Sequence, residues 1–281
     1  SLFADDVTIL TPDRSRDLAA ADAQWAVDVV EDWSKDWKLN LNASKSEVAF
    51  FSTWTHEANH IPSVSIGGTP IPFNPTPKLL GVRFDRTLSF EPHAKEVARA
   101  ASGKLGMIAS VGNSKWGWDK EHLRQLYFSF MRSKMDYSGP GWQPWLSDHS
   151  INLLERTQNK ALRVVTGQLR SSPVESLRLE TGVPSYDTQI QRSTLKSMEL
   201  AKRLPPDHPR HIALTSAIPP KNTRRSWARK GNELSGKFLP PEAESREPIR
   251  FISNPPWQSM NTISIFPDLA GVSSKSIDQN Y

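Results

Sequence analysis

The alternation of hydrophobic and polar residues predicts a hairpin and then a long helix at the start of the chain. Two β-prone runs within residues 2–10 flank the acidic pair Asp5-Asp6, which predicts a hairpin with the acids at its turn. After an N-cap at Asp13 or Ser15, large apolar residues recur at helical spacing. This spacing predicts a helix whose apolar stripe packs into the core. The stripe consists of Leu18, Trp25, Val29, Trp33 and Trp37.

Further β-prone runs follow this helix. Residues 63–66 and 69–71 predict a hairpin joined at Gly67-Gly68, while 47–51 and 78–85 each predict one strand. The first 85 residues are therefore expected to be α+β, with mostly antiparallel pairing.

The period changes to a helical one beyond Leu88. Helices are expected at 90–112, 119–136, 147–166 and 186–204. After Pro205-Pro206 the prolines cluster and the periodicity disappears, which is typical of a linker. The chain is thus expected to comprise a mixed part at 1–88, a helical part at 89–204 and a Pro-rich, basic, largely irregular tail at 205–281.

Composition and charge narrow the function classes. The chain has no cysteine, which excludes disulfides and thiolate zinc sites, and it has no apolar run of membrane-spanning length. Nine acids against three bases in residues 1–36 precede nine bases against four acids in residues 86–134. This asymmetry fits a metal site beside a polyanion-binding surface, although ordinary solvated helix faces give the same counts.

Asp5 and Asp6 carry the most specific candidate chemistry. Two carboxylates at a rigid hairpin supply the oxygen ligands that Mg²⁺ requires, and nucleotidyl transfer commonly uses two such ions. Taken alone, the pair is more typical of a surface turn with solvated acids than of a metal site. His56 and His60 do not have metalloprotease spacing, and no nucleophile elbow or phosphate-binding loop occurs.

Several stretches in order resemble the reverse transcriptases of non-LTR retrotransposons, especially those of the trypanosomatid type. FADD at 3–6 resembles the family's aromatic-x-Asp-Asp box, and LNLNASKS at 39–46 is similar to its next palm element. LLGVRFD at 79–85 resembles the strand pair that grips the primer end. Downstream, LSFEPH at 88–93, Trp116-Gly117, LERTQNKALR at 154–163 and Thr166-Gly167 resemble the helical thumb region.

The resemblance implies an RNA-directed DNA polymerase, with a partial palm at 1–88 and a helical thumb at 89–204. It implies that Asp5 and Asp6 bind Mg²⁺ or Mn²⁺ and that Lys45 lies near the incoming deoxynucleoside triphosphate. It also implies that Gly81 lets the primer backbone approach closely. The alternatives are a surface lysine at Lys45 and a strand glycine at a bulge at Gly81.

The implied partners are an RNA template, a DNA primer and the RNA–DNA hybrid. Lys95, Arg99 and Lys104 are spaced to line a helix face that follows phosphates. Trp116 and Trp118 are candidates for base stacking or for ordinary packing. The basic run KNTRRSWARK at 221–230, which contains Arg224 and Arg225, is compatible with nucleic-acid contact, a nuclear import signal or a solvated loop. We expect a nuclear or cytoplasmic protein that is neither secreted nor membrane-bound.

The family places a third metal-binding Asp and its fingers upstream of the Asp-Asp box, where this sequence starts. The chain is therefore expected to be a fragment that does not polymerise DNA alone, and 255–278 resembles a linker toward a ribonuclease H domain. A non-catalytic nucleic-acid-binding remnant and a degenerate retrotransposon copy without a selected role are the alternatives.

Overall fold

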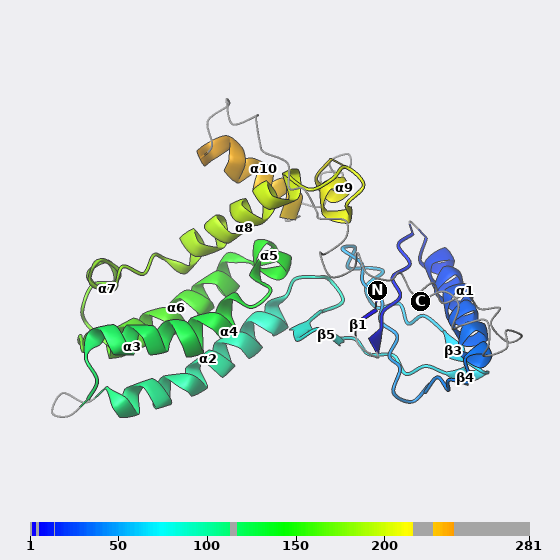
Figure 1. Ribbon diagram of the computed structural model, residues 1–281, viewed down its shortest axis with the longest axis horizontal. Helices are drawn as coiled ribbons and strands as arrows, with labels where there is room; N and C mark the ends of the chain where they lie inside the picture. The colour runs from blue at the N-terminus through cyan, green and yellow to red at the C-terminus, as the bar shows by residue number, and fades with distance from the viewer. Residues whose placement is uncertain (1, 4–5, 14, 113–116, 216–226, 239–281) are drawn as a thin grey trace, which may run out of the picture.

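The computed structural model describes residues 2–3, 6–13, 15–112, 117–215 and 227–238 (Figure 1). This part of the chain is mostly helical and contains a few short antiparallel strand pairs. The α+β character expected of the first 85 residues is present, but each strand is only two residues long. The assignment of these parts to a palm and a thumb stays a prediction.

The chain begins with a hairpin followed by a long helix. Strands β1 (Leu2–Phe3) and β2 (Asp6–Val7) pair antiparallel, as predicted, with Phe3 opposite Asp6. Helix α1 (Arg16–Asp36) follows, with Ser15 at its N-cap position.

Helix α1 packs against a second hairpin, formed by β3 (Ser65–Ile66) and β4 (Thr69–Pro70) as predicted. Gln24 joins the two elements, because its Nε2 donates to the carbonyl of Ser65 at 3.0 Å and its Oε1 accepts from the Ser65 amide at 2.8 Å. Oε2 of Glu31 accepts from the Gly67 amide at 3.0 Å.

The prediction that the apolar stripe of α1 packs into the core is wrong. Trp25, Trp33 and Trp37 are 69%, 51% and 57% exposed, and Leu18 and Val29 are exposed as well. An α-helix turns by about 100° per residue, which places Gln24 and Glu31 on one face and the apolar stripe on another. Because the first face contacts the β3–β4 hairpin, the stripe points away from that hairpin. Hydrogen bonds from polar residues, rather than the largest apolar side chains, set the orientation of α1.

Two of the predicted strands differ in the structure. Residues 47–51 form no strand, and Val48 makes only an isolated parallel bridge with Phe73. Residues 78–85 form a hairpin instead of one strand, with β5 (Lys78–Leu79) paired to β6 (Val82–Arg83) across a turn at Leu80-Gly81. Both turn residues have positive φ, which a two-residue hairpin of the I′ type requires.

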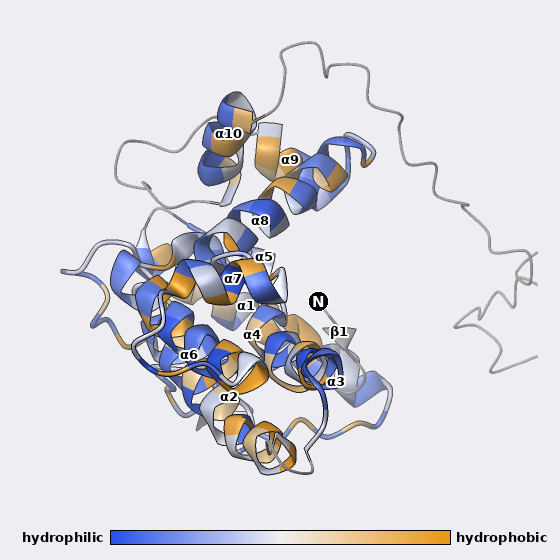
Figure 2. Ribbon diagram, turned by 90° about the vertical axis from the view of Figure 1, so that its left-hand side faces the viewer, coloured by the Kyte–Doolittle hydropathy of each residue, from blue (hydrophilic) through white to orange (hydrophobic). Residues whose placement is uncertain are grey.

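Helices α2 (Glu91–Val111), α6 (Asp148–Thr166) and α8 (Tyr186–Lys202) confirm three of the predicted helices. Local capping explains their ends: Ser147 accepts from the Ser150 amide and Ser185 from the Thr188 amide, and Gly167 terminates α6 with a φ of +69°. Hydrophilic and hydrophobic residues alternate along these helices (Figure 2).

The predicted helix at 119–136 contains a π-helical segment. It consists of α3 (Lys120–Leu126), the π-helix η1 (Tyr127–Arg132) and α4 (Ser133–Asp136), and Asp119 caps its start. Two short helices occur where none is predicted, α5 (Gly139–Trp142) and α7 (Val174–Thr181), and a 3₁₀ turn, η2 (Gln143–Trp145), follows α5.

Helices α2, α4 and α6 lie side by side (Figure 1) and enclose the main core. Leu154, Ala161 and Leu162 of α6 and Ala94 and Ala101 of α2 are fully buried there.

A charged network crosses this core. The guanidinium of buried Arg132 pairs with Asp136 at 2.7 Å and donates to Gln158 Oε1 at 2.5 Å and to the Tyr127 hydroxyl at 3.2 Å. Tyr186 completes the network, since the Arg132 guanidinium lies over its ring, 5.3 Å from the ring centroid. The buried charge is therefore partnered on several sides, as burial requires.

Two helices lie within the segment that the sequence predicts to be irregular. They are α9 (Pro209–Thr215) and α10 (Trp227–Phe238). α10 packs closely on α8, because a Cβ at Gly231 would lie 2.6 Å from Sδ of Met198. The prediction of irregular structure is wrong for these two stretches. The many prolines nearby in the sequence obscured their helical pattern.

Candidate nucleic-acid interface

The predicted acidic pair is described only at its second member. Asp5 lies outside the described residues. Asp6 is exposed and begins strand β2 opposite Phe3, so it follows the hairpin turn rather than lying in it.

Asp6 supplies one hard oxygen donor of the kind that Mg²⁺ binds. Within the residues that the structure describes, no group of three or more His, Asp or Glu side chains is gathered in a way that could hold a metal ion. The described residues thus hold only one member of the predicted pair, and the metal site stays a prediction.

Lys45 lies in an Asn-centred turn downstream of α1. Its amide donates to the carbonyl and to Oδ1 of Asn42, at 3.2 and 3.1 Å, and its side chain is exposed. In the described part of the chain, no hydrogen bond or ion pair joins Lys45 to Asp6, so the two candidates are not brought into direct contact.

Gly81 occupies the tip of the β5–β6 hairpin, which lies where the N-terminal part meets the helical body (Figure 1). Glu96 of α2 fastens the base of this hairpin, with Oε2 2.8 Å from Nε of Arg83 and Oε1 3.2 Å from Nζ of Lys78. The hydrogen bonds from Arg83 and Lys78 lower the pKa of Glu96 to about 2, against the effect of its partial burial. We refer to Lys78, Arg83 and Glu96 as the hairpin clamp.

The loop between the hairpin and α2 is organised around Asp85. Its carboxylate accepts hydrogen bonds from the amides of Ser89 and Phe90 and from the hydroxyls of Thr87 and Ser89. Burial alone would raise the pKa of Asp85, but these hydrogen bonds bring it below its ordinary value. The carboxylate thus stays charged and fixes the start of α2 relative to the hairpin.

Lys95 and Arg99 are one helical turn apart on the exposed side of α2. Nζ of Lys95 pairs with Glu91 at 2.7 Å, whereas Arg99 has no hydrogen-bond or ion-pair partner among the described residues. Lys104 does not share their face, because the step of five residues turns it about 140° from Arg99. Its ammonium instead lies 5.7 Å over the ring of Phe130.

Three of the remaining candidates lie outside the described residues: Trp116, Arg224 and Arg225. Trp118 is exposed, and its ring meets that of His122 edge-on at 6.0 Å. Its stacking on a base stays a prediction.

Sequence reasoning missed two further basic pairs, Arg156 and Lys160 on α6, and Arg192 and Lys196 on α8. All four side chains are exposed and have no hydrogen-bond or ion-pair partner within the described part of the chain. Their i,i+4 spacing places each pair on one helix face, which is the signal that could have identified them.

The start of α6 lies near the start of α2, since His149 adds to the effect of Lys95 in lowering the pKa of Glu91.

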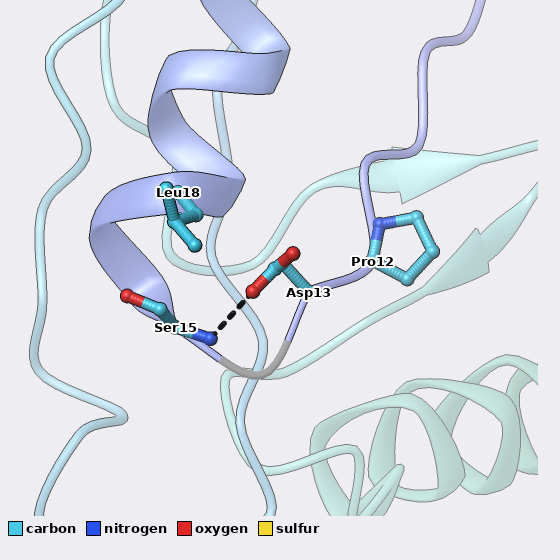
Figure 3. A pocket seen from close by; sticks show the side chains of 4 residues that line it. All are labelled: Pro12, Asp13, Ser15 and Leu18. Carbon is cyan, nitrogen blue, oxygen red and sulfur yellow. Dashed lines mark hydrogen bonds between the residues drawn. The ribbon is translucent and has the colours of Figure 1, made fainter.

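A shallow hollow lies at the start of α1 (Figure 3). Pro12, Asp13, Ser15 and Leu18 line it, and Oδ1 of Asp13 accepts from the Ser15 amide at 2.7 Å. Its one carboxylate already serves the backbone, so the hollow offers little to a ligand.

None of the helices that the structure describes is both long and apolar enough to cross a membrane.

Comparison with curated proteins finds distant similarity to RNA-directed DNA polymerases of non-LTR retrotransposons over most of the chain. The chain is 24% identical over 197 residues to the RNA-directed DNA polymerase from mobile element jockey of Drosophila melanogaster, a match covering 70% of this chain and 21% of that protein. It is 28% identical over 167 residues to the probable RNA-directed DNA polymerase from transposon X-element of the same organism, covering 59% of this chain and 18% of that protein. A third match is the retrovirus-related Pol polyprotein from type-1 retrotransposable element R1 of Bradysia coprophila, 24% identical over 73% of this chain and 20% of that protein.

The chain spans about a fifth of the length of these curated relatives. No family model matches it, and no solved structure does. The resemblance to non-LTR reverse transcriptases is thus supported as a distant similarity, and the trypanosomatid type stays a prediction.

Proposed function

We propose that this chain is part of a non-LTR retrotransposon reverse transcriptase and that its helical body holds the RNA–DNA hybrid. The observation that carries the proposal is the similarity to RNA-directed DNA polymerases over most of the chain. Exposed basic side chains that have no hydrogen-bond or ion-pair partner among the described residues, such as Arg99, Arg156 and Lys160, support it. Such cations are available to neutralise phosphates, which supplies most of the sequence-independent affinity for nucleic acids.

In this proposal the β5–β6 hairpin and the face of α2 that carries Lys95 and Arg99 contact the nucleic-acid backbone. Gly81 has no side chain and is exposed at the tip, so a phosphate or sugar can approach its backbone closely on the side that the Tyr137 ring does not cover. The hairpin clamp holds the base of the hairpin on α2.

Asp5 and Asp6 are proposed as ligands of Mg²⁺ or Mn²⁺ in the whole polymerase, and Lys45 as a cation for the triphosphate. The metal would there supply the charge stabilisation needed for nucleotidyl transfer. Two carboxylates alone carry too little negative charge for two divalent ions. We therefore expect the 281-residue chain by itself to show no primer extension.

Binding of a fluorescein-labelled RNA–DNA hybrid, measured by anisotropy at rising salt, tests the proposal. The double variant Arg156→Gln with Lys160→Gln is expected to weaken binding and to flatten the slope of log K against log salt by about 1.4–1.8, since each phosphate contact contributes ~0.7–0.9. The control is Lys35→Gln, because that lysine of the acidic helix α1 already pairs with Glu31 and Asp32.

Salt-independent binding by the unmodified chain, or an unchanged slope in the double variant, would count against a phosphate-binding helical body. Robust primer extension by the chain alone would show that two carboxylates are enough to support catalysis with divalent ions.

A further inference from the structure

The turn at the tip of the β5–β6 hairpin has a backbone conformation that its sequence does not favour. Leu80 has a φ of +46° and Gly81 a φ of +84°. Glycine tolerates positive φ, but a branched, bulky side chain such as that of Leu80 rarely adopts it. Contacts from elsewhere in the chain must therefore hold the turn, and strain of this kind is concentrated at functional sites.

Tyr137, the residue that follows α4, supplies such contacts. Its hydroxyl donates to the carbonyl of Leu80 at 3.0 Å. Its ring lies beside Gly81, where an added Cβ would be 3.4 Å from Cε1 of the tyrosine. Tyr137 thus touches both residues of the turn, with a hydrogen bond to one and a ring against the other.

The backbone of Tyr137 is itself fixed through a closed circuit of contacts. Nε1 of buried Trp142 donates to the carbonyl of Tyr137 at 3.0 Å. The ring of Trp142 meets that of His93 edge-on at 4.6 Å, and Nδ1 of His93 accepts from the Arg83 amide of β6 at 3.3 Å. The circuit leads from the hairpin through the helical body and back to the hairpin.

His93 suits this acceptor role. Burial lowers its pKa, which favours the neutral ring whose Nδ1 can accept a hydrogen bond. The charged groups around it are Glu96, which opposes that shift, and Lys134, Lys78 and Arg83, which add to it.

The position of the tyrosine contact argues for a local rather than a global role. Tyr137 and Leu80 are both half exposed, at 52% and 50%, so the contact between them adds little to the core. What it determines is where the tip of the hairpin lies relative to α2.

We propose that Tyr137 is a positioning residue that holds the Leu80-Gly81 turn on the helical body, so that the turn and the Arg99 face of α2 present one rigid surface to a nucleic-acid backbone. This inference rests on the proposed function. It assigns to Tyr137 a role in ordering that surface, distinct from the phosphate contacts of the basic residues.

The test combines amide hydrogen exchange at Gly81 and Val82 with hybrid binding by anisotropy. Tyr137→Phe keeps the ring and removes only the hydroxyl, and Tyr137→Ala removes both. We expect about fivefold faster exchange and about fivefold weaker hybrid binding for the phenylalanine variant, the size of one hydrogen bond, and a larger loss of both for the alanine variant. The control is Leu179→Ala, which removes an exposed apolar side chain of α7.

Thermal unfolding accompanies both measurements, and the melting temperature of Tyr137→Phe is expected to stay close to that of the unmodified chain. Unchanged exchange and unchanged binding in Tyr137→Phe would overturn the positioning role, as would a loss of binding that merely follows a large drop in melting temperature. If the unmodified chain does not bind the hybrid while Tyr137→Phe still exchanges faster, the proposed function fails and the structural hold on the turn stands.

Discussion

Replacing Glu96 by Gln tests whether the hairpin clamp stabilises the fold through charge. Glutamine keeps the shape of the side chain but removes the negative charge that faces Arg83 and Lys78. We expect the variant to be less stable at neutral pH, and the loss to shrink as the pH falls, because protonation of Glu96 in the unmodified chain then removes the same charge.

The magnitude follows from the pKa of Glu96. The drop from 4.5 to about 2 corresponds, at ~1.36 kcal/mol per pKa unit, to an upper bound of about 3.4 kcal/mol. The side chains of Lys78 and Arg83 are 47% and 35% exposed, so solvent screening reduces this to about 1–2 kcal/mol.

The sign is fixed by linkage, since a carboxyl whose folded-state pKa is lowered stabilises the fold above its unfolded pKa. The contribution is fully present well above pH 4.5 and is lost between about 4.5 and 2, with about two-fifths gone by pH 3.5.

Urea unfolding of the unmodified chain and of Glu96→Gln at neutral pH and at acidic pH measures this difference. The matched control is Glu121→Gln, whose exposed pair with Arg124 at 3.1 Å should contribute no more than ~0.5 kcal/mol. An equal difference in stability between the unmodified chain and Glu96→Gln at pH 3.5 and at pH 7 would refute stabilisation by the charge of Glu96.

Three further changes address the packing of the helical body and its junction with the hairpin. Arg132→Leu leaves Asp136 without its cation and should cost about 3–5 kcal/mol in urea unfolding, and a cost below ~1 kcal/mol would contradict the network. Gly231→Ala should lower the free energy of unfolding by about 1–3 kcal/mol, because the added methyl group would clash with Met198. Gly236→Ala on the same helix has open space and should be neutral or stabilising by ~0.5–1 kcal/mol. Equal effects of the two changes would argue against the contact of α10 with α8. Asp85→Asn should destabilise by about 1–2 kcal/mol at neutral pH, with the difference fading as the pH drops below 3.8, and a difference that grows in acid would be inconsistent with the lowered pKa.

The helical body was largely predictable from sequence because its signals are local. Apolar residues at helical spacing, N-cap serines such as Ser147 and a terminal glycine such as Gly167 mark the elements within a residue or two. The π-helical turn at 127–132 left no such signal, and the contacts of its buried Arg132 are with residues distant in the sequence, Gln158 of α6 and Tyr186 of α8.

The orientation of α1 was not predictable in the same way. Periodicity identifies an apolar face, but it does not say which element of the fold covers that face. Here Gln24 and Glu31, polar residues on another side, make the contacts with β3 and Gly67. The turn at Leu80-Gly81 was missed for a related reason, because Leu at positive φ is held by Tyr137 from 57 positions away.

The candidate site shows the same limit. The sequence suggested Lys104 as a neighbour of Arg99, although a step of five residues separates their faces. The regular pairs on α6 and α8 passed unnoticed because acidic and apolar residues surround them in the sequence.

The exposed face formed by Trp25, Trp33 and Trp37 along α1 and at its C-terminal end has a practical consequence for work in solution. Asp22, Asp32 and Asp36 are exposed on the same helix, and we expect repulsion between carboxylates to oppose contact between two copies of this face in dilute buffer. Added salt screens that repulsion while leaving the attraction between aromatic surfaces in place. We therefore expect rising salt to weaken any phosphate contacts of the cations and, at the same time, to favour association through the exposed tryptophans. The usable range of ionic strength has both a lower and an upper end.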